Sequence, residues 1–191
     1  MAKAEYRSAI RSRKLISMAL VDLLQEKPLD KITVTDVVRR AEVNRGTFYA
    51  HYSDIQDVIN HIIEETFVHI KEKVFDGHKD ISDIPHVLVE IAKEIVEGNN
   101  DFCRKVMSSS ASAFMEDQLV KLICEYLVQH QSKFSKGDRE QYVLKIHFCA
   151  GGLSNLYKDW FEGKLSVSLD GLTKQAETFL NRIFIDAVPV C

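Results

Sequence analysis

Proline and glycine are scarce in this chain, which holds only 3 and 8 of them among its 191 residues. So few helix breakers, together with 46% hydrophobic residues, exclude a disordered protein and favour a helix-rich globular one. No apolar run approaches the roughly 20 residues that a membrane span needs, and no signal-peptide core follows the basic first residues. We therefore expect a soluble, cytoplasmic protein without a membrane partner.

Motifs for catalysis and metal binding are absent as well. The sequence has no G-x-S-x-G, no P-loop, no H-E-x-x-H and no catalytic Cys/His signature. Its four cysteines, Cys103, Cys124, Cys149 and Cys191, form no C-x-x-C pair. Reduced and mostly buried thiols are one interpretation of them, and a redox-sensing pair is the alternative. We expect neither an enzyme nor a cofactor.

The charge is distributed unevenly, although the net charge of −3 argues against nucleic-acid binding. Residues 1–56 hold 10 Lys and Arg against 7 Asp and Glu, whereas the remaining residues hold 15 against 21. A modestly basic end that can approach phosphates and an acidic body that DNA would repel fit a DNA-binding protein.

Apolar residues recur at helical spacing along the chain, and neither a strand pattern nor an internal repeat is visible. Besides two short helices between residues 33 and 52, the sequence predicts helices over about 12–27, 53–74, 84–97, 99–108, 112–133, 138–162 and 169–185. The fold class is therefore all-α. We expect an N-terminal three-helix DNA-binding domain over 1–56 and a C-terminal helical ligand-binding and dimerisation domain over 57–191.

The most informative stretch is ITVTDVVRRAEVNRGTFYAHY, residues 32–52. Thr33 and Asp36 form the pattern of a capping box at the start of one short helix, and Asn44 is a good N-cap for the next. Val43 and Phe48 fit a hydrophobic staple. The second helix is too polar to be buried, which is typical of a helix-turn-helix whose second helix enters the DNA major groove.

Residues 12–63 resemble the DNA-binding domain of the TetR family, with TVTDVVRRA followed by VNRGTFYAHY. The resemblance implies that the chain binds double-stranded DNA through side chains at the start of the first short helix and along the second. The residues expected to contact DNA are Thr33, Thr35, Asn44, Arg45, Gly46, Thr47, Tyr49, Ala50 and His51.

Physical chemistry fits these roles. Arg45 can donate to guanine O6 and N7, Gly46 permits close approach of the backbone, and Tyr49 and His51 can each donate to a phosphate. In the alternative interpretation, Tyr49 and Tyr52 pack under the first helix, and Arg39 and Arg40 form a solvated face.

Two positions depart from the family pattern. Glu42 stands in the turn where the family usually has Gly, and a left-handed Glu would cost about 1 kcal/mol. Ile55 stands where the family commonly has Lys, so one phosphate contact lacks its usual donor.

The segment FCAGGLSNLYKDWFEGKL, residues 148–165, resembles more loosely the subset related to activators of dihydroxyacetone kinase operons. In the family, the last two helices form a homodimer as a four-helix bundle. The expected interface residues are Gly151, Gly152, Leu156, Trp160, Phe179 and Ile183. Packing inside one subunit is the alternative for this apolar stripe.

A ligand pocket would lie among the helices between residues 53 and 162. Candidate lining residues are Phe67, Phe102, Met107, Phe114, Met115, Tyr126 and Phe148, each of which could equally be core. His61, Glu65 and His69 are aligned on one helix face as a metal site would need, but a solvated face explains them too, and we expect no metal.

These features favour a homodimeric repressor that binds a palindromic operator and is released by a small-molecule effector. The alternative is a DNA-bound co-activator whose C-terminal domain docks a protein partner.

Overall fold

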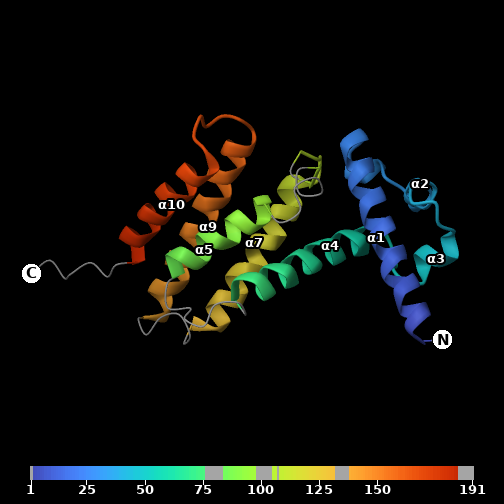
Figure 1. The fold of residues 1–191 in the computed structure, drawn as a ribbon, viewed down its shortest axis with the longest axis horizontal. Helices are drawn as coiled ribbons and strands as arrows, with labels where there is room; N and C mark the ends of the chain where they lie inside the picture. Colours follow the sequence, from blue (N-terminus) through green and yellow to red (C-terminus); the bar gives the residue numbers. More distant parts are fainter. Residues whose placement is uncertain (1, 76–83, 98–104, 107, 132–137, 185–191) are drawn as a thin grey trace, which may run out of the picture. The chain divides into compact units, whose positions relative to one another are not determined.

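A computed structural model describes the chain except residues 1, 76–83, 98–104, 107, 132–137 and 185–191. Within the described residues there are eight α-helices and no strand, which confirms the all-α prediction (Figure 1). None of these helices is long and apolar enough to cross a membrane. The described residues divide into two compact units, one made of 1–66 and 99–117, the other of 67–98 and 118–191.

The first unit is built around a long N-terminal helix, α1 (Ala2–Glu26). A 3-10 turn (Leu29–Lys31) leads to α2 (Val34–Arg40), α3 (Arg45–Tyr49) and the first part of α4 (Ile55–Ile70). Helix α1 starts about ten residues earlier than the apolar pattern predicts, because the preceding stretch is rich in Ala, Arg and Lys and free of Gly and Pro.

Apolar side chains from all of these helices meet in the core of the first unit. Those with the least exposed surface are Ile16, Leu20, Leu24, Val37, Phe48, Val58 and Ile59. Burial of these side chains fixes α2 and α3 on one side of α1, so their remaining faces point outward (Figure 1).

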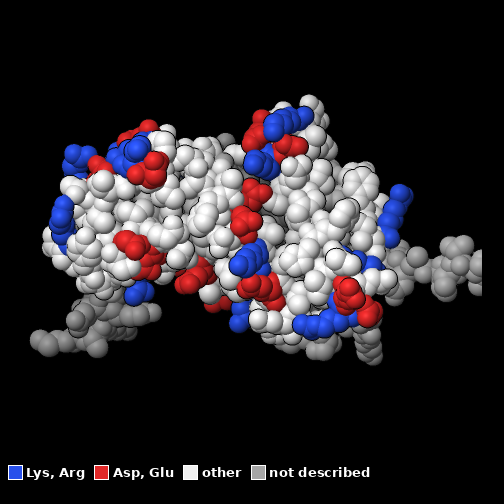
Figure 2. All heavy atoms as spheres, turned by 180° about the vertical axis from the view of Figure 1, so that it is seen from behind, with Lys and Arg blue, Asp and Glu red and all other residues white. Residues whose placement is uncertain are grey.

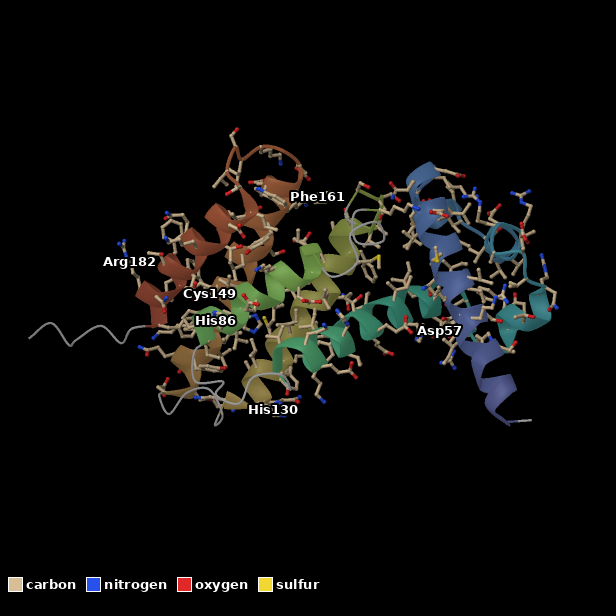
Figure 3. All side chains as sticks on the ribbon, viewed as in Figure 1. Asp57, His86, His130, Cys149, Phe161 and Arg182 are labelled. Carbon is tan, nitrogen blue, oxygen red and sulfur yellow. The ribbon has the colours of Figure 1, made fainter. Side chains whose placement is uncertain are left out.

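The second unit packs α5 (Ile84–Glu97), the later part of α7 (Ser112–Gln129), α9 (Arg139–Phe161) and α10 (Leu169–Phe184) around another core. Helix α4 ends in a π-helical turn, Lys71–Phe75, where the sequence predicts continued α-helix. Helix α5 lies against both α9 and α10. Its His86 faces α10, with Nδ1 3.3 Å from Oε1 of Glu177, while Arg182 points away from the bundle (Figure 3).

Two buried cysteines belong to this second core. Cys124 and Cys149 are free thiols, and burial raises the pKa of each to about 11. Both are therefore protonated at neutral pH and poor nucleophiles. Cys103 and Cys191 lie outside the described residues.

Candidate nucleic-acid interface

Helix α2 begins with the capping box that the sequence predicts. The Thr33 hydroxyl accepts from the backbone N–H of Asp36 at 3.2 Å, and the Asp36 carboxylate accepts from the backbone N–H of Thr33 at 2.9 Å. These reciprocal bonds satisfy two N–H groups that would otherwise lack partners at a helix start. The start of α2 is thereby fixed.

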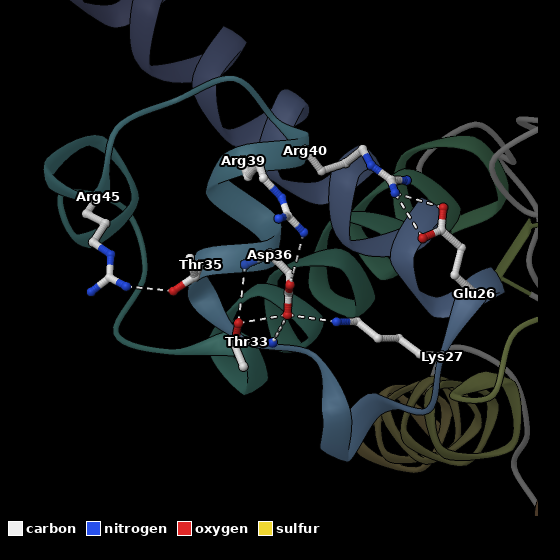
Figure 4. A network of polar contacts seen from close by, with 8 residues as sticks. All are labelled: Glu26, Lys27, Thr33, Thr35, Asp36, Arg39, Arg40 and Arg45. Carbon is white, nitrogen blue, oxygen red and sulfur yellow. Dashed lines mark hydrogen bonds and ion pairs between the residues drawn. The ribbon is translucent and has the colours of Figure 1, made fainter.

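The Asp36 carboxylate also ties α2 to the end of α1. Lys27 Nζ donates to Asp36 Oδ2 at 2.8 Å, and Arg39 lies 3.4 Å from Oδ1 (Figure 4). Hydrogen bonds from Lys27 and then from Thr33 hold the pKa of Asp36 well below its usual value. A second link joins the same two helices, because Nη2 of Arg40 donates to both carboxylate oxygens of Glu26, at 2.8 and 2.9 Å.

The turn between α2 and α3 is held by backbone hydrogen bonds with one residue in the left-handed region. Val43 N–H donates to the carbonyl of Val38 at 3.0 Å, and Glu42 has a φ of 54°. This is the arrangement that usually places Gly after a helix end. The strained Glu42 expected from the sequence is confirmed.

Helix α3 is capped by Asn44, also as predicted. Its Oδ1 accepts from the backbone N–H of Thr47 at 2.7 Å and from the Thr47 hydroxyl at 3.2 Å. Phe48 is fully buried and anchors the helix in the core, with the Tyr49 ring packed edge-on against it, the centroids 5.4 Å apart. Tyr49 nevertheless remains 55% exposed, so its hydroxyl end is free to meet a ligand.

Most of the predicted contact residues in and around α2 and α3 are exposed. Thr33, Thr35, Asn44, Arg45, Gly46, Tyr49 and Ala50 are exposed, and Thr47 and His51 are half-buried. The two helices are linked because Arg45 donates to the Thr35 hydroxyl at 2.6 Å (Figure 4). The guanidinium therefore lies over α2 with most of its donors available.

Cations in the first unit fall into two groups. Those near the end of α1 and on α2 pair with carboxylates, whereas among the described residues no carboxylate pairs with Arg11, Arg13, Lys14 or Arg45. On the face drawn in Figure 2, many Lys and Arg side chains lie beside Asp or Glu. The cations on α1 and α3 are therefore available to bind phosphate. Neutralising DNA phosphates with Lys and Arg contributes much of the free energy of DNA binding.

His51 follows α3 and lies in the field of Arg13. Burial, and then the positive charge of Arg13, lower the pKa of His51. The imidazole is therefore neutral at pH 7 and keeps one ring N–H to donate. A nearby phosphate would accept this hydrogen bond.

The predicted dimer residues divide by exposure. Gly151 and Gly152 are exposed, Phe179 is 52% exposed, and Leu156, Trp160 and Ile183 are partly buried against the core of their own unit. A Cβ added at either glycine would meet nothing within 4 Å. Among the residues that the structure describes, no side chain therefore packs closely against these two glycines.

The predicted pocket residues are not brought together as one lining. Phe67 and Tyr126 pack edge to face with centroids 5.8 Å apart, and Met115 is buried. Phe114 and Phe148 are 41% and 72% exposed, so they do not line the interior of this chain. Phe102 and Met107 lie outside the described residues.

The three residues considered for a metal site diverge. His61 lies 3.2 Å from Glu65, but His69 pairs with Glu94 of α5 at 2.7 Å. Among the residues that the structure describes, no group of three His, Cys, Asp or Glu side chains could hold a metal ion.

Sequence reasoning missed Glu26, the last residue of α1, and Lys27, which follows it; both side chains hold α2. Both lie many residues before their partners, and no short-range spacing rule links them. The sequence shows a charged residue at the end of one helix, but it does not show which residue of another helix will pair with it.

Comparisons with known proteins agree with this geometry. The profile "Bacterial regulatory proteins, tetR family" matches residues 16–62, and "Transcriptional regulator C-terminal region" matches residues 82–182. The chain is 28% identical over 89 residues to the uncharacterized HTH-type regulator YvdT of Bacillus subtilis, spanning 45% of this chain and 46% of YvdT. It is also 28% identical over 64 residues to the dhaKLM operon transcriptional activator DhaS of Lactococcus lactis, spanning 34% of each.

These matches span less than half the length of either curated relative. A TetR-family regulator from Syntrophomonas wolfei has the same fold, with a TM-score of 0.66, 18% identity, and coverage of 94% of this chain and 98% of that one. The matched profiles and structures are those of transcriptional regulators rather than enzymes. Since the two profiles together take in the helix-turn-helix and more than half of the chain besides, the chain belongs to the TetR family of DNA-binding transcriptional regulators.

Proposed function

We propose that the exposed surface of α2 and α3 reads a palindromic operator in the major groove. The observation that carries this proposal is the exposed Arg45, which no carboxylate among the described residues neutralises and which Thr35 holds in place. Arg45 contacts bases, and Tyr49, His51, Thr33 and Thr47 contact the backbone.

The regulator acts as a homodimer through α9 and α10. Support comes from an exposed apolar stripe on these helices, in which Leu144 is 65%, Phe148 72% and Phe179 52% exposed. Gly151 and Gly152 lie one turn beyond Phe148 on the same helix. A second copy of the helix could approach closely at these two positions.

The second unit controls DNA binding in response to a small-molecule effector, most simply as a repressor that is released. The Phe67–Tyr126 pair, with His130 stacked on Tyr126 at 4.2 Å, offers aromatic surface for such a ligand. On this proposal, residues 1–56 bind DNA and residues 57–191 regulate and dimerise.

The co-activator alternative has one observation in its favour. DhaS, which is similar to this chain over 34% of its length, is named an operon activator. In that case the C-terminal residues dock a protein, and DNA binding does not respond to small molecules.

The test is selection of binding sites from random duplex DNA at physiological salt, first with the wild-type protein. We expect an inverted repeat whose half-sites lie about 34–36 Å apart. Arg45→Ala should then lose about 1–3 kcal/mol of discrimination at one base position of each half-site. Lys31→Ala is the matched control, because Lys31 is an exposed cation of the same unit that pairs with its neighbour Asp30.

Failure to recover any motif would contradict the proposal that the exposed surface of α2 and α3 binds specific DNA sequences. So would an Arg45→Ala protein that keeps full affinity and selectivity. A single half-site without a repeat would contradict the dimer alone.

A further inference from the structure

Residues 105–106 and 108–111, called the bracing segment here, contact the last turns of α1. Lys105 Nζ lies 2.9 Å from Asp22 Oδ1, and Gln25 Nε2 donates to the carbonyl of Lys105 at 2.5 Å. The Ser108 hydroxyl donates to Gln25 Oε1 at 3.0 Å. Partners about 80 residues apart in sequence therefore share three polar contacts, and the bracing segment belongs to the same compact unit as α1.

Ser110 extends these contacts to the backbone at the end of α1. Its N–H lies 3.5 Å from the carbonyl of Leu24, and its hydroxyl lies 3.4 Å from the carbonyl of Lys27. The last carbonyls of a helix have no partners within the helix. The bracing segment thus covers the exposed backbone as well as the side chains of this helix end.

The same end of α1 carries the links to the helix-turn-helix. Lys27 donates to Asp36 at the cap of α2, and Glu26 accepts from Arg40. Thr35, beside Asp36 in α2, accepts from Arg45 of α3 (Figure 4). Polar contacts between the bracing segment and α1, between the end of α1 and α2, and between α2 and Arg45 are thus connected through neighbouring residues of the backbone, all within one unit.

The bracing segment also leads directly into α7. This helix begins at Ser112 in the first unit, and its residues 118–129 belong to the second. The residues that contact α1 therefore directly precede a helix that extends into the second unit.

We propose that the bracing segment positions the helix-turn-helix for DNA through the end of α1, with Lys105, Ser108, Asp22 and Gln25 as positioning residues. These residues do not touch DNA. The inference deepens the proposed function, on which it rests, because it names the contacts through which the C-terminal part would alter the reading surface.

The first test compares amide hydrogen exchange of the DNA-free full chain with that of Lys105→Met and Gln25→Leu. Loss of the brace should accelerate exchange in α2 and α3 while leaving α5 and α9 unchanged. Lys105→Arg should restore the wild-type pattern, since it keeps the ion pair. Lys31→Met is the matched control, because among the described residues Lys31 forms an ion pair with its neighbour Asp30 alone.

The second test measures affinity for the duplex recovered by site selection across a range of salt concentrations. Lys105→Met should weaken binding by about 5-fold with an unchanged salt slope. A slope that falls by about 1 would assign Lys105 to a phosphate contact instead and overturn the proposal. Unchanged exchange in α2 and α3, or faster exchange in every helix, would also overturn it, even if the wild-type protein binds its operator as proposed.

Discussion

Replacing Gly151 and Gly152 of α9 with Ala tests whether this face of the helix is exposed to solvent or packs against a second copy of the chain. In a helix interior, Gly is about 1 kcal/mol less favourable than Ala. Because a Cβ at either position would meet nothing within 4 Å in the described part of the chain, the double variant should stabilise an isolated subunit by about 2 kcal/mol. For a chain of this size, that corresponds to a rise in Tm of roughly 4–8 °C.

If the two glycines lie against a partner helix, the added methyl groups will instead overpack the interface. Overpacking typically costs about 1–3 kcal/mol, so the dimer Kd should rise by roughly 5- to 150-fold. Sedimentation velocity over a series of protein concentrations measures this Kd directly. We expect weaker dimerisation in the double variant, and stabilisation only at concentrations where the protein is monomeric.

An independent variant keeps this reasoning testable. Phe148→Glu places a charge in the same exposed stripe and should also dissociate the dimer, whereas Phe114→Glu, on an exposed Phe of α7, should not. A double glycine variant that keeps its Kd and gains Tm would refute the role assigned to the glycines. A Phe148→Glu protein that remains dimeric would place the interface elsewhere.

Two further predictions concern the helix-turn-helix. Glu42→Gly should stabilise the protein by about 1 kcal/mol by relieving the left-handed strain, measured as a higher denaturation midpoint in urea. Glu42→Ala loses the charge but keeps the strain, so its midpoint should not rise. An equal rise in both variants would refute the strain argument. The lowered pKa of Asp36 means that its charged form stabilises the fold: this contribution is complete above about pH 4, and it is lost as pH falls below the ordinary value of 3.8. Urea midpoints between pH 3 and 6 should therefore fall less steeply in Asp36→Asn than in wild type, while the exposed neighbour variant Asp30→Asn should follow wild type; identical acid limbs would contradict the linkage.

Local signals predicted local structure well. The caps at Thr33 and Asn44 and the left-handed Glu42 follow from residue types within a few positions, where the backbone geometry decides the partner. The Lys27–Asp36 and Lys105–Asp22 pairs depend on how distant helices pack, and no spacing in the sequence encodes that.

Aromatic residues were the least predictable part of the candidate site. Phe67 and Phe148 give the same apolar signal in a helix, but one packs against Tyr126 and the other is exposed on α9. Periodicity identifies the apolar face of a helix, and it cannot distinguish a core from a surface that another chain would cover. The individual DNA, dimer and pocket residues accordingly remain predictions.

The first unit is assembled from two stretches of chain, 1–66 and 99–117, and this has a consequence for its synthesis. On the ribosome, the helix-turn-helix emerges well before the bracing segment that contacts the end of α1. Chain elongation proceeds at roughly 5–20 residues per second. The helix-turn-helix is therefore synthesised some seconds before the residues of the bracing segment that complete its unit. A nascent chain stalled before residue 105 should therefore hold α1 less firmly than one stalled beyond residue 117.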